Sequence, residues 1–325
     1  MKVRLRIFPA LLIVALAASL AAFPALAADS QGHFDRTLTV TGAVDLDVQT
    51  GSGDITVRPG DSGKVEIHAK IRANGWGEMD ARIQELENNP PIEQSGNTIR
   101  IGHIENHDLM RHISISYELI VPAETKLRAE SGSGDQRANG ITGPVEATSG
   151  SGGLKLNTIG GEVKAHSGSG DIELDSIRGG ARATTGSGTI RAIGIAGGLI
   201  ASSGSGDVKF EQTAPGDVEI QTGSGDVEMK GVSGAARVST GSGSITAQGD
   251  PKGGWRLHTG SGNVSVDFPK QASFDVVART SSGNIETTHE ITVQGNISPR
   301  ELRGKVGAGG PVVELSTSSG TIEIR

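Results

Sequence analysis

The sequence predicts an all-β protein: a parallel β-solenoid with about 18 residues per coil, behind an N-terminal β-rich cap that contains one short helix. One observation is a Ser-Gly pair with a serine or threonine two positions before it, which occurs eleven times. Another is its spacing, because from Ser133 to Ser261 the steps between successive serines are 18, 18, 18, 18, 19, 18 and 19 residues. Such a period indicates one small unit stacked on copies of itself. The eleven serines are Ser52, Ser133, Ser151, Ser169, Ser187, Ser205, Ser224, Ser242, Ser261, Ser282 and Ser319.

Residues 1–27 have the features of a secretory signal peptide. Basic residues near the start precede an apolar run from Ile7 to Leu20, and Ala25–Ala27 supplies the small residues that a signal peptidase recognises. We expect cleavage after Ala27 and export to the periplasm or cell surface. No later stretch is long and apolar enough for a span, so no transmembrane segment is expected after cleavage. An uncleaved membrane anchor is the alternative.

Composition narrows the class of protein. The chain has no cysteine, which excludes a disulfide framework and a lipid-modified cysteine. Losing the leader removes three positive and no negative charges, so the formal net charge falls from −7 to −10. That argues against nucleic acid or anionic lipid bound through a general field. Aromatic residues are 3% of the chain and glycine supplies 49 of 325 residues, which favours a thin aliphatic core turned by glycine corners.

Residues 28–125 interrupt the period, and we predict a β-rich segment that covers one end of the rod, as terminal caps do in solenoids. The expected elements are a first coil, one helix, a hairpin and a further strand, at Val44–Val57, Glu78–Asn88, Ile92–Ile101 and Ile113–Val121.

Residues 126–325 are predicted to form the solenoid. Apolar residues alternate with polar ones before each serine, as Val163 and Ala165 do before Ser169, and alternate again after it. This pattern indicates two short strands with one buried face, joined by Gly-Ser-Gly. Stacked roughly 4.8 Å apart, ten to eleven coils would make a rod on the order of 50 Å long. The outward positions mix both signs of charge, which predicts a solvated face.

The Ser-Gly pairs are interpreted as a structural turn motif. Glycine suits a positive φ or a close backbone approach. The hydroxyl residue before each pair and the serine of the pair are expected to form columns in which each hydroxyl donates to the next coil and accepts from the last. The motif residues are Ser133, Gly134, Ser151, Gly152, Ser169, Gly170, Ser187, Gly188, Ser205, Gly206, Ser224, Gly225, Ser242, Gly243, Ser261 and Gly262.

The C-terminal residues lose the strict period, because the match after Ser282 lies 37 residues on. A short helical turn at Ser298–Pro299 and a glycine-rich loop from Arg303 to Gly310 are expected there. A last coil follows, with strands around Val313–Leu315 and Ile322–Ile324, and its edge is expected to be uncapped.

No motif predicts a catalytic, cofactor-binding or metal site. Calcium-binding solenoid repeats place an aspartate at a fixed position, whereas six copies here replace the aspartate that follows Ser-Gly, which is typical of a turn residue. No helix follows the glycines to bind a phosphate, and no serine has a recognisable histidine partner. The histidine cluster matches no standard zinc spacing and is predicted to be a surface loop; its residues are His103, Glu105, His107, Asp108 and His112.

One segment order resembles a known family. Tyr117–Pro122 runs into Leu127–Asp135, Ser-Gly-Asp coils follow, and Gly309–Leu315 leads to the closing strand at Ile324. This order resembles the bacterial putative-adhesin family of β-strand-repeat proteins, a domain of unknown function found on exported proteins. The similarity extends from about Phe34 to Arg325. It implies a β-solenoid at the cell envelope and brings no catalytic residues, while the usual acid is missing at positions 153, 189 and 244.

We therefore expect a signal peptide at 1–27, an N-terminal segment at 28–125 and solenoid repeats at 126–325. The expected function is a non-enzymatic, exported cell-envelope interaction or adhesin-like module that binds an envelope protein or polysaccharide and no nucleic acid. Two alternatives remain. A carbohydrate-active β-helix enzyme would need a groove with two carboxylates about 5 to 10 Å apart. A structural protein would stack end to end through the final coil.

Overall fold

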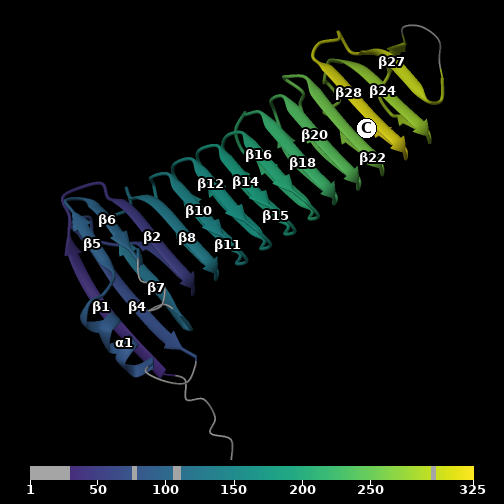
Figure 1. Cartoon of the computed structure of the whole chain (residues 1–325). Coiled ribbons are helices and arrows are strands. Elements are labelled where there is room, and N and C mark those ends of the chain that lie inside the picture. Colours follow the sequence, from purple (N-terminus) through teal and green to yellow (C-terminus); the bar gives the residue numbers. More distant parts are fainter. Residues whose placement is uncertain (1–29, 75–78, 105–110, 294–297) are drawn as a thin grey trace, which may run out of the picture.

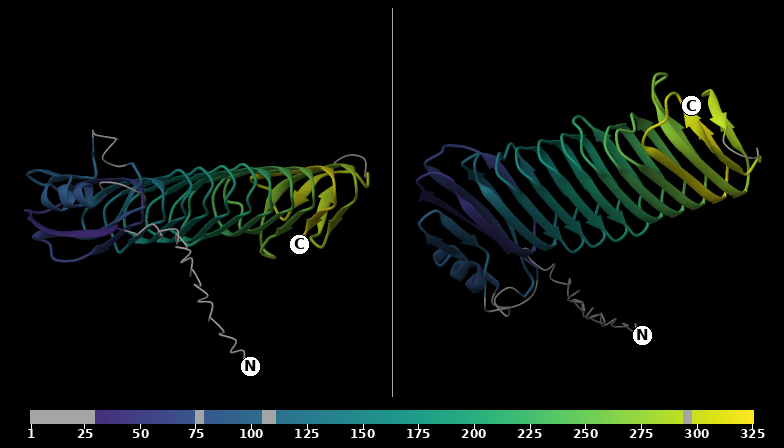
Figure 2. Two further views of the ribbon diagram at one scale, coloured as in Figure 1. Left: turned by 60° about the horizontal axis from the view of Figure 1, so that its bottom comes forward. Right: turned by 90° about the horizontal axis from the view of Figure 1, so that it is seen from above.

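Two long, facing β-sheets form a flattened rod (Figures 1 and 2). The computed structural model describes residues 30–74, 79–104, 111–293 and 298–325, and the predicted signal peptide lies outside them. The predicted parallel β-solenoid with one short helix is confirmed. Among the described residues, no helix is both long and apolar enough to cross a membrane.

Each strand belongs to one of two sheets, and we give the strands in their order along the rod. Sheet A has 14 strands: β1 (Ser30–Thr39), β4 (Lys64–Ala73), β7 (Ile113–Val121), β3 (Ile55–Pro59), β9 (Gln136–Asn139), β11 (Leu154–Ile159), β13 (Ile172–Ile177), β15 (Ile190–Ile195), β17 (Val208–Gln212), β19 (Val227–Val232), β21 (Ile245–Gly249), β23 (Val264–Asp267), β29 (Ile322–Ile324) and β25 (Ile285–Thr287). Sheet B has 15: β5 (Ile92–Ser95), β6 (Thr98–Ile101), β2 (Asp45–Ser52), β8 (Lys126–Ser133), β10 (Val145–Ser149), β12 (Val163–Ser167), β14 (Ala181–Thr185), β16 (Leu199–Ser203), β18 (Val218–Ser224), β20 (Ala236–Ser242), β22 (Trp255–Ser261), β28 (Val312–Ser319), β24 (Phe274–Ser282), β27 (Glu301–Val306) and β26 (Ile291–Val293).

One coil is a strand of sheet B, a Gly-Ser-Gly corner and the next strand of sheet A. Neighbouring coils pair in parallel and in register, so that Val163 lies between Val145 and Ala181. Alternate side chains point inward, and the core between the sheets consists of fully buried residues such as Leu174 and Ala183. Aliphatic side chains fill most of this space, and a few aromatic ones, among them Phe210 and Trp255, are also fully buried.

At the N-terminal end, the order of coils in space differs from their order in the sequence. Strands β6 and β7 form the outermost coil, and β2 with β3 lies between that coil and the coil of β8 and β9. The predicted hairpin is present as antiparallel β5 and β6. Sheet A continues outward through antiparallel β7, β4 and β1.

The helix α1 (Met79–Asn88) closes the core at this end. Its apolar residues Met79, Ile83 and Leu86 are buried, and it packs on β1 and β4 (Figure 1). The Glu87 carboxylate accepts a hydrogen bond of 2.9 Å from the backbone N–H of His33 in the edge strand β1. The His33 N–H is therefore not free to pair with a further strand added at this edge of sheet A. The helix was expected from Glu78, which lies outside the described residues.

The expected uncapped final coil is wrong, because the coil of β28 and β29 lies inside the stack. Strand β28 pairs in parallel with both β22 and β24, and in Figure 1 the yellow β28 lies between the green β22 and β24. The coil of β24 and β25 is outermost, and antiparallel β27 covers its sheet B edge. The loop expected from Arg303 is also wrong up to Val306, since those residues complete β27.

The interior position of this coil can be tested through Leu315. Leu315 and Leu257 are both fully buried between two coils, so Leu315→Ala and Leu257→Ala should each lower the free energy of unfolding by about 2–5 kcal/mol. Ile285→Ala should cost less, since Ile285 is only partly buried in the edge strand β25. Urea unfolding measures all three, and a cost for Leu315→Ala no larger than that for Ile285→Ala would contradict the interior position.

Candidate functional site

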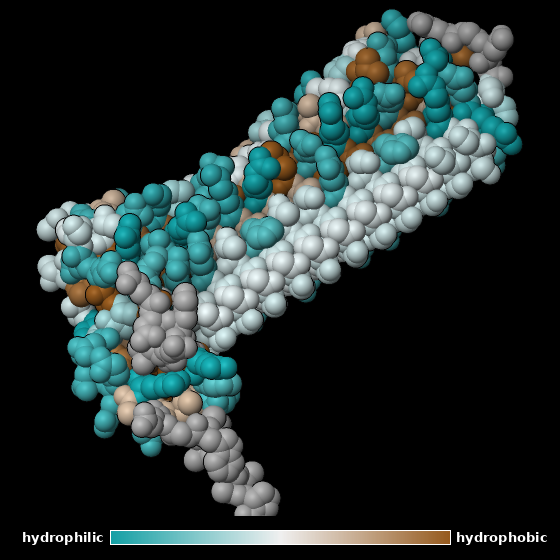
Figure 3. All heavy atoms as spheres, viewed as in Figure 1, coloured by the Kyte–Doolittle hydropathy of each residue, from teal (hydrophilic) through white to brown (hydrophobic). Residues whose placement is uncertain are grey.

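The Ser-Gly pairs lie together along one narrow edge of the rod. Each pair of the predicted turn motif, from Ser133–Gly134 to Ser261–Gly262, occupies the corner between a sheet B strand and the following sheet A strand. In Figure 3 this edge is the smooth pale band that follows the lower side of the rod. We call it the Gly-Ser-Gly edge.

The buried hydroxyls of this edge bond to backbone groups, which corrects the expected hydroxyl columns. Thr185 Oγ1 donates to the carbonyl of Gly170 in the preceding coil at 2.9 Å. All eleven hydroxyl residues donate to a carbonyl of the coil on their N-terminal side in space. They are Thr50, Ser131, Ser149, Ser167, Thr185, Ser203, Thr222, Thr240, Thr259, Thr317 and Thr280.

Two versions of the corner differ in where a glycine N–H donates. In the coil of Thr185, the N–H of Gly188 donates to the Thr185 hydroxyl at 3.1 Å. In the coil of Thr240, the N–H of Gly243 donates instead to the Ser261 carbonyl of the next coil at 2.9 Å. A Cβ on Gly188 would clash with the Gly170 carbonyl oxygen. Backbone approach therefore requires glycine there.

The aspartates of the motif serve the backbone of the next coil. Asp171 Oδ1 accepts the N–H of Thr189 at 2.7 Å, and Asp207 Oδ1 accepts the N–H of Asp226 at 2.8 Å. Asn263 does the same for Thr321 at 2.9 Å. These bonds join only neighbouring coils, and the amide of Asn263 replaces the carboxylate. The variation of the residue that follows each Ser-Gly pair is therefore compatible with a structural role for that residue.

The histidine cluster is only partly described. Glu105, His107 and Asp108 lie outside the described residues. His103 Nε2 lies 3.3 Å from Asp47 Oδ1. In the described part of the chain, no three histidine, aspartate or glutamate side chains lie together as a metal site would require.

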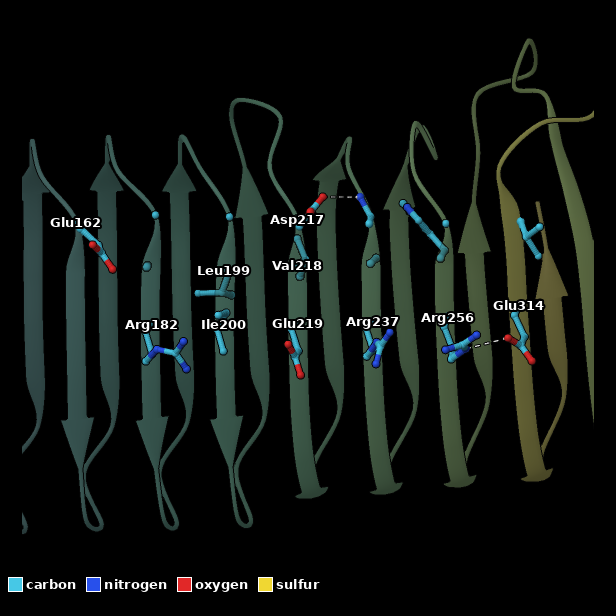
Figure 4. A pocket seen from close by; sticks show the side chains of 18 residues that line it. Glu162, Arg182, Leu199, Ile200, Asp217, Val218, Glu219, Arg237, Arg256 and Glu314 are labelled. Atoms are coloured by element: carbon cyan, nitrogen blue, oxygen red, sulfur yellow. Dashed lines mark hydrogen bonds and ion pairs between the residues drawn. The ribbon is translucent and has the colours of Figure 1, made fainter.

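A shallow groove crosses the outer face of sheet B, and this groove is the candidate functional site (Figure 4). It has a volume of about 890 Å³ and spans the strands from β14 to β28. A second groove of about 470 Å³ continues it toward β2, and the two share Glu162. The floor is low because the residue directly before each of several sheet B strands is small, at Gly180, Gly198, Ala235 and Gly254.

The next outward position forms what we call the central row, which Figure 4 shows from Arg182 to Glu314. Its members are direct partners in the parallel register, so each lies beside the next. The central row comprises the nine members between β8 and β28, in spatial order Arg128, Glu146, Lys164, Arg182, Ile200, Glu219, Arg237, Arg256 and Glu314.

Charges in the central row are only partly paired within the chain. Arg256 bonds Glu314 at 2.8 Å, and Arg128 bonds Glu130, which together with Glu146 and Asp47 raises the pKa of Arg128. Among the described residues, Lys164, Arg182 and Arg237 are in no ion pair. The register instead places positive charges side by side, Lys164 beside Arg182 and Arg237 beside Arg256. Neighbouring like charges destabilise a sheet. A partner with negative charges would therefore be attracted to this face.

The groove also contains exposed aliphatic side chains. Ile200 is 37% exposed and Val312 is 50% exposed, and they are the large exposed hydrophobic residues of the described chain. Both line the groove. From the sequence this face was interpreted as a solvated surface of mixed charge, and the signal that could have revealed it is an isoleucine at an outward position of a charged row.

Comparison with known proteins supports a shared architecture. The family model described as Toastrack DUF4097 matches residues 43–325. A search of curated proteins finds no match.

Similar solved structures come from three bacteria. A putative cell adhesion protein from Clostridium sporogenes ATCC 15579 is 12% identical, covers 91% of this chain and 99% of its own, and has a TM-score of 0.21. A putative lipid binding protein from Parabacteroides distasonis ATCC 8503 is 11% identical with coverages of 90% and 97% and a TM-score of 0.36. A putative adhesin from Bacteroides fragilis NCTC 9343 is 13% identical with coverages of 91% and 98% and a TM-score of 0.29.

The two corner versions predict different costs for the same substitution. Thr185→Val leaves the Gly170 carbonyl and the Gly188 N–H without their partner, whereas Thr240→Val removes only the bond to the Gly225 carbonyl. Both threonines are buried. Because an unsatisfied buried polar group costs about 1–3 kcal/mol, Thr185→Val should destabilise the protein by about 1–3 kcal/mol more than Thr240→Val does.

Denaturant unfolding of the two variants measures this difference. Thr184→Val is the matched control, since Thr184 is the outward neighbour of Thr185 in β14 and should change stability little. Equal costs for Thr185→Val and Thr240→Val would show that the additional glycine bond does not stabilise the corner.

Proposed function

Because the chain belongs to the Toastrack DUF4097 family, and its β-solenoid presents a long open groove, we propose that it is a non-enzymatic interaction module of the cell envelope, similar in role to an adhesin. In this proposal the signal peptide is cleaved after Ala27 and the mature protein resides in the periplasm or on the cell surface. The groove face of sheet B binds its partner.

The observation that carries the proposal is the form of the groove. It crosses six strands of sheet B, from β14 to β28, which at roughly 4.8 Å per strand is a length of roughly 24 Å. The backbone groups of these strands bond to neighbouring coils, so side chains must hold the partner. A long, open surface with aliphatic and charged groups suits a macromolecule better than an enclosed small substrate.

Three of the four carboxylates that line the groove have partners within the described chain, and only Glu162 has none, which favours binding over catalysis. Asp217 Oδ1 accepts the N–H of Ala235 at 3.0 Å, Glu219 accepts a bond from Gln221 at 3.1 Å, and Glu314 pairs with Arg256. A glycosidase pair needs one carboxyl group that is free to donate a proton and a second that attacks or activates water. These contacts supply neither arrangement.

End-to-end stacking through the coil of β28 and β29 is not favoured either. That coil is hydrogen-bonded to a neighbour on both sides, and β27 and β26 cover the sheet B edge of the outermost coil.

The location is tested by fractionating cells and treating intact cells with protease. The proposal expects a protein that starts at Ala28 in the envelope fraction, and protease accessibility on intact cells distinguishes the surface from the periplasm. A protein that retains residues 1–27 in the cytosol would contradict export.

The groove is tested by retention of the purified protein on envelope fragments from producing cells. Arg182→Glu should weaken retention about tenfold, because it places a negative charge beside Ile200 and reverses an unpaired side chain of the central row. Arg191→Glu is the matched control, since Arg191 is an exposed outward arginine on sheet A of the same coil. Equal retention of both variants and the unmodified protein would count against the groove as the binding face.

A further inference from the structure

At equal distances on the two sides of one residue, Ile200, the charges of the central row are mostly opposite in sign. On one side the row reads Arg182, Lys164, Glu146 and Arg128, and on the other side Glu219, Arg237, Arg256 and Glu314. The exposed isoleucine is at the centre. Read outward from Ile200, three of the four successive positions carry opposite charges on the two sides.

We propose that the partner of the groove face is a second copy of this chain, bound face to face through sheet B, with a twofold axis along β16. This inference rests on the proposed function, because it names the partner of the same face. Because the axis runs along the strand direction, the second rod lies antiparallel to the first. Each row of one copy then faces the same row of the other copy. The central row of one copy therefore meets the central row of the other in reverse order.

In this arrangement the two Ile200 side chains meet on the axis. Arg182 faces Glu219 of the second copy, Glu146 faces Arg256 of the second copy, and Arg128 faces Glu314 of the second copy. Symmetry repeats each contact, so six opposed pairs form. Lys164 faces Arg237 of the second copy, and symmetry repeats this contact as well, so the row contains two like-charged pairs beside the six opposed ones.

The register depends on the position of the axis. Half a coil toward β14, Glu219 would still face Lys164 and Arg237 would face Glu146, but Arg256 would face Arg128 and the pair of Ile200 side chains would be lost. Moving the axis by half a coil toward β18 would set Arg182 against Arg237, Lys164 against Arg256 and Glu146 against Glu314. All three contacts would then join like charges. Like-charge contacts across an interface exclude wrong registers, so the axis along β16 is selected over this neighbour.

The rows on either side of the central row are compatible with the same twofold axis. On the side of the Gly-Ser-Gly edge, Thr184 would face Gln221 and His166 would face Ser239 of the second copy, which are polar pairs without like charges. On the other side, the small floor residues leave the groove that can receive long side chains.

Nine coils from β8 to β28 present a flat face of roughly 700 Å², from roughly 3.3 Å per residue and 4.8 Å per coil. Stable interfaces bury about 800 Å² per partner.

This association closes on itself. A twofold interface uses the same surface of both copies, so it stops at two molecules. The proposal therefore differs from end-to-end stacking, which would continue into fibres.

Sedimentation of the purified protein over a wide concentration range tests the inference. The unmodified protein should sediment as a monomer–dimer equilibrium. Arg182→Glu and Glu219→Arg should each raise the dissociation constant about tenfold, because each turns two symmetry-related opposed pairs into like-charged pairs. Arg191→Glu on sheet A should leave it unchanged, and circular dichroism checks that all variants fold.

Mixing the two single variants gives the decisive measurement. In a mixed pair, the glutamate introduced at position 182 faces the arginine introduced at position 219, and the native Glu219 faces the native Arg182 of the other copy. Association should therefore return in the equimolar mixture although each variant alone is mostly monomeric. A mixture that stays monomeric, or an unmodified protein that is monomeric at every concentration, would overturn the inference.

Envelope fragments from cells that lack the protein separate this inference from the proposed function. If the unmodified protein is monomeric while Arg182→Glu still weakens retention on fragments from producing cells, the groove has a different partner and only the inference fails. If Arg182→Glu and Glu219→Arg abolish dimers but retention on fragments of both kinds is unchanged, the inference holds and the proposed function of the groove fails. Retention that depends on Arg182 and occurs only on fragments from producing cells supports both.

Discussion

Every coil must repeat the backbone path of its neighbours, since each strand takes its hydrogen bonds from the coils on both sides. The other features of the rod follow from this constraint. Gly188 cannot carry a Cβ because the Gly170 carbonyl of the preceding coil lies there. The hydroxyl of Thr185 is buried because it bonds that same carbonyl. The inward side chains are mostly aliphatic, since the two sheets are joined by tight corners at both edges. Only the residues at outward positions can vary freely, and those on sheet B form the proposed binding face.

Much of this architecture could be predicted from the sequence because the constraint is periodic. The hairpin at Ile92–Ile101, the strand at Ile113–Val121 and the solenoid coils all correspond to described elements. The order of the end coils could not be predicted, because all coils carry the same alternation and the same corner. Leu315 fits equally well beside Leu257 or at a free end, and only the long-range pairing of β28 decides. The strand Glu301–Val306 was missed because its glycine and charged residues resemble a loop, yet it gains partners from β24.

The candidate site was less predictable than the fold. The outward charges of sheet B are visible in the sequence, but their meaning depends on register, which makes Arg237 and Arg256 neighbours although 19 positions separate them. The groove itself arises because Gly180, Gly198, Ala235 and Gly254 fall in one row. Ile200 gains significance from the same alignment, since the register places this exposed apolar side chain between the charges of Arg182 and Glu219.

The interior position of the coil formed by β28 and β29 has a consequence for how the rod is made. Residues 274–306 leave the ribosome before residues 312–324, yet their coil is separated from β22 by the later segment. They can reach their final place only after the chain has turned back and the later segment has filled the gap. At the other end, the outermost coil of β6 and β7 instead joins the coil of β2 and β3, which precedes it in the chain, across the residues of β4, α1 and β5. Both ends thus close through contacts distant in sequence, which slow folding. The central coils can propagate from neighbour to neighbour, so assembly of the rod is expected to run from the middle outward.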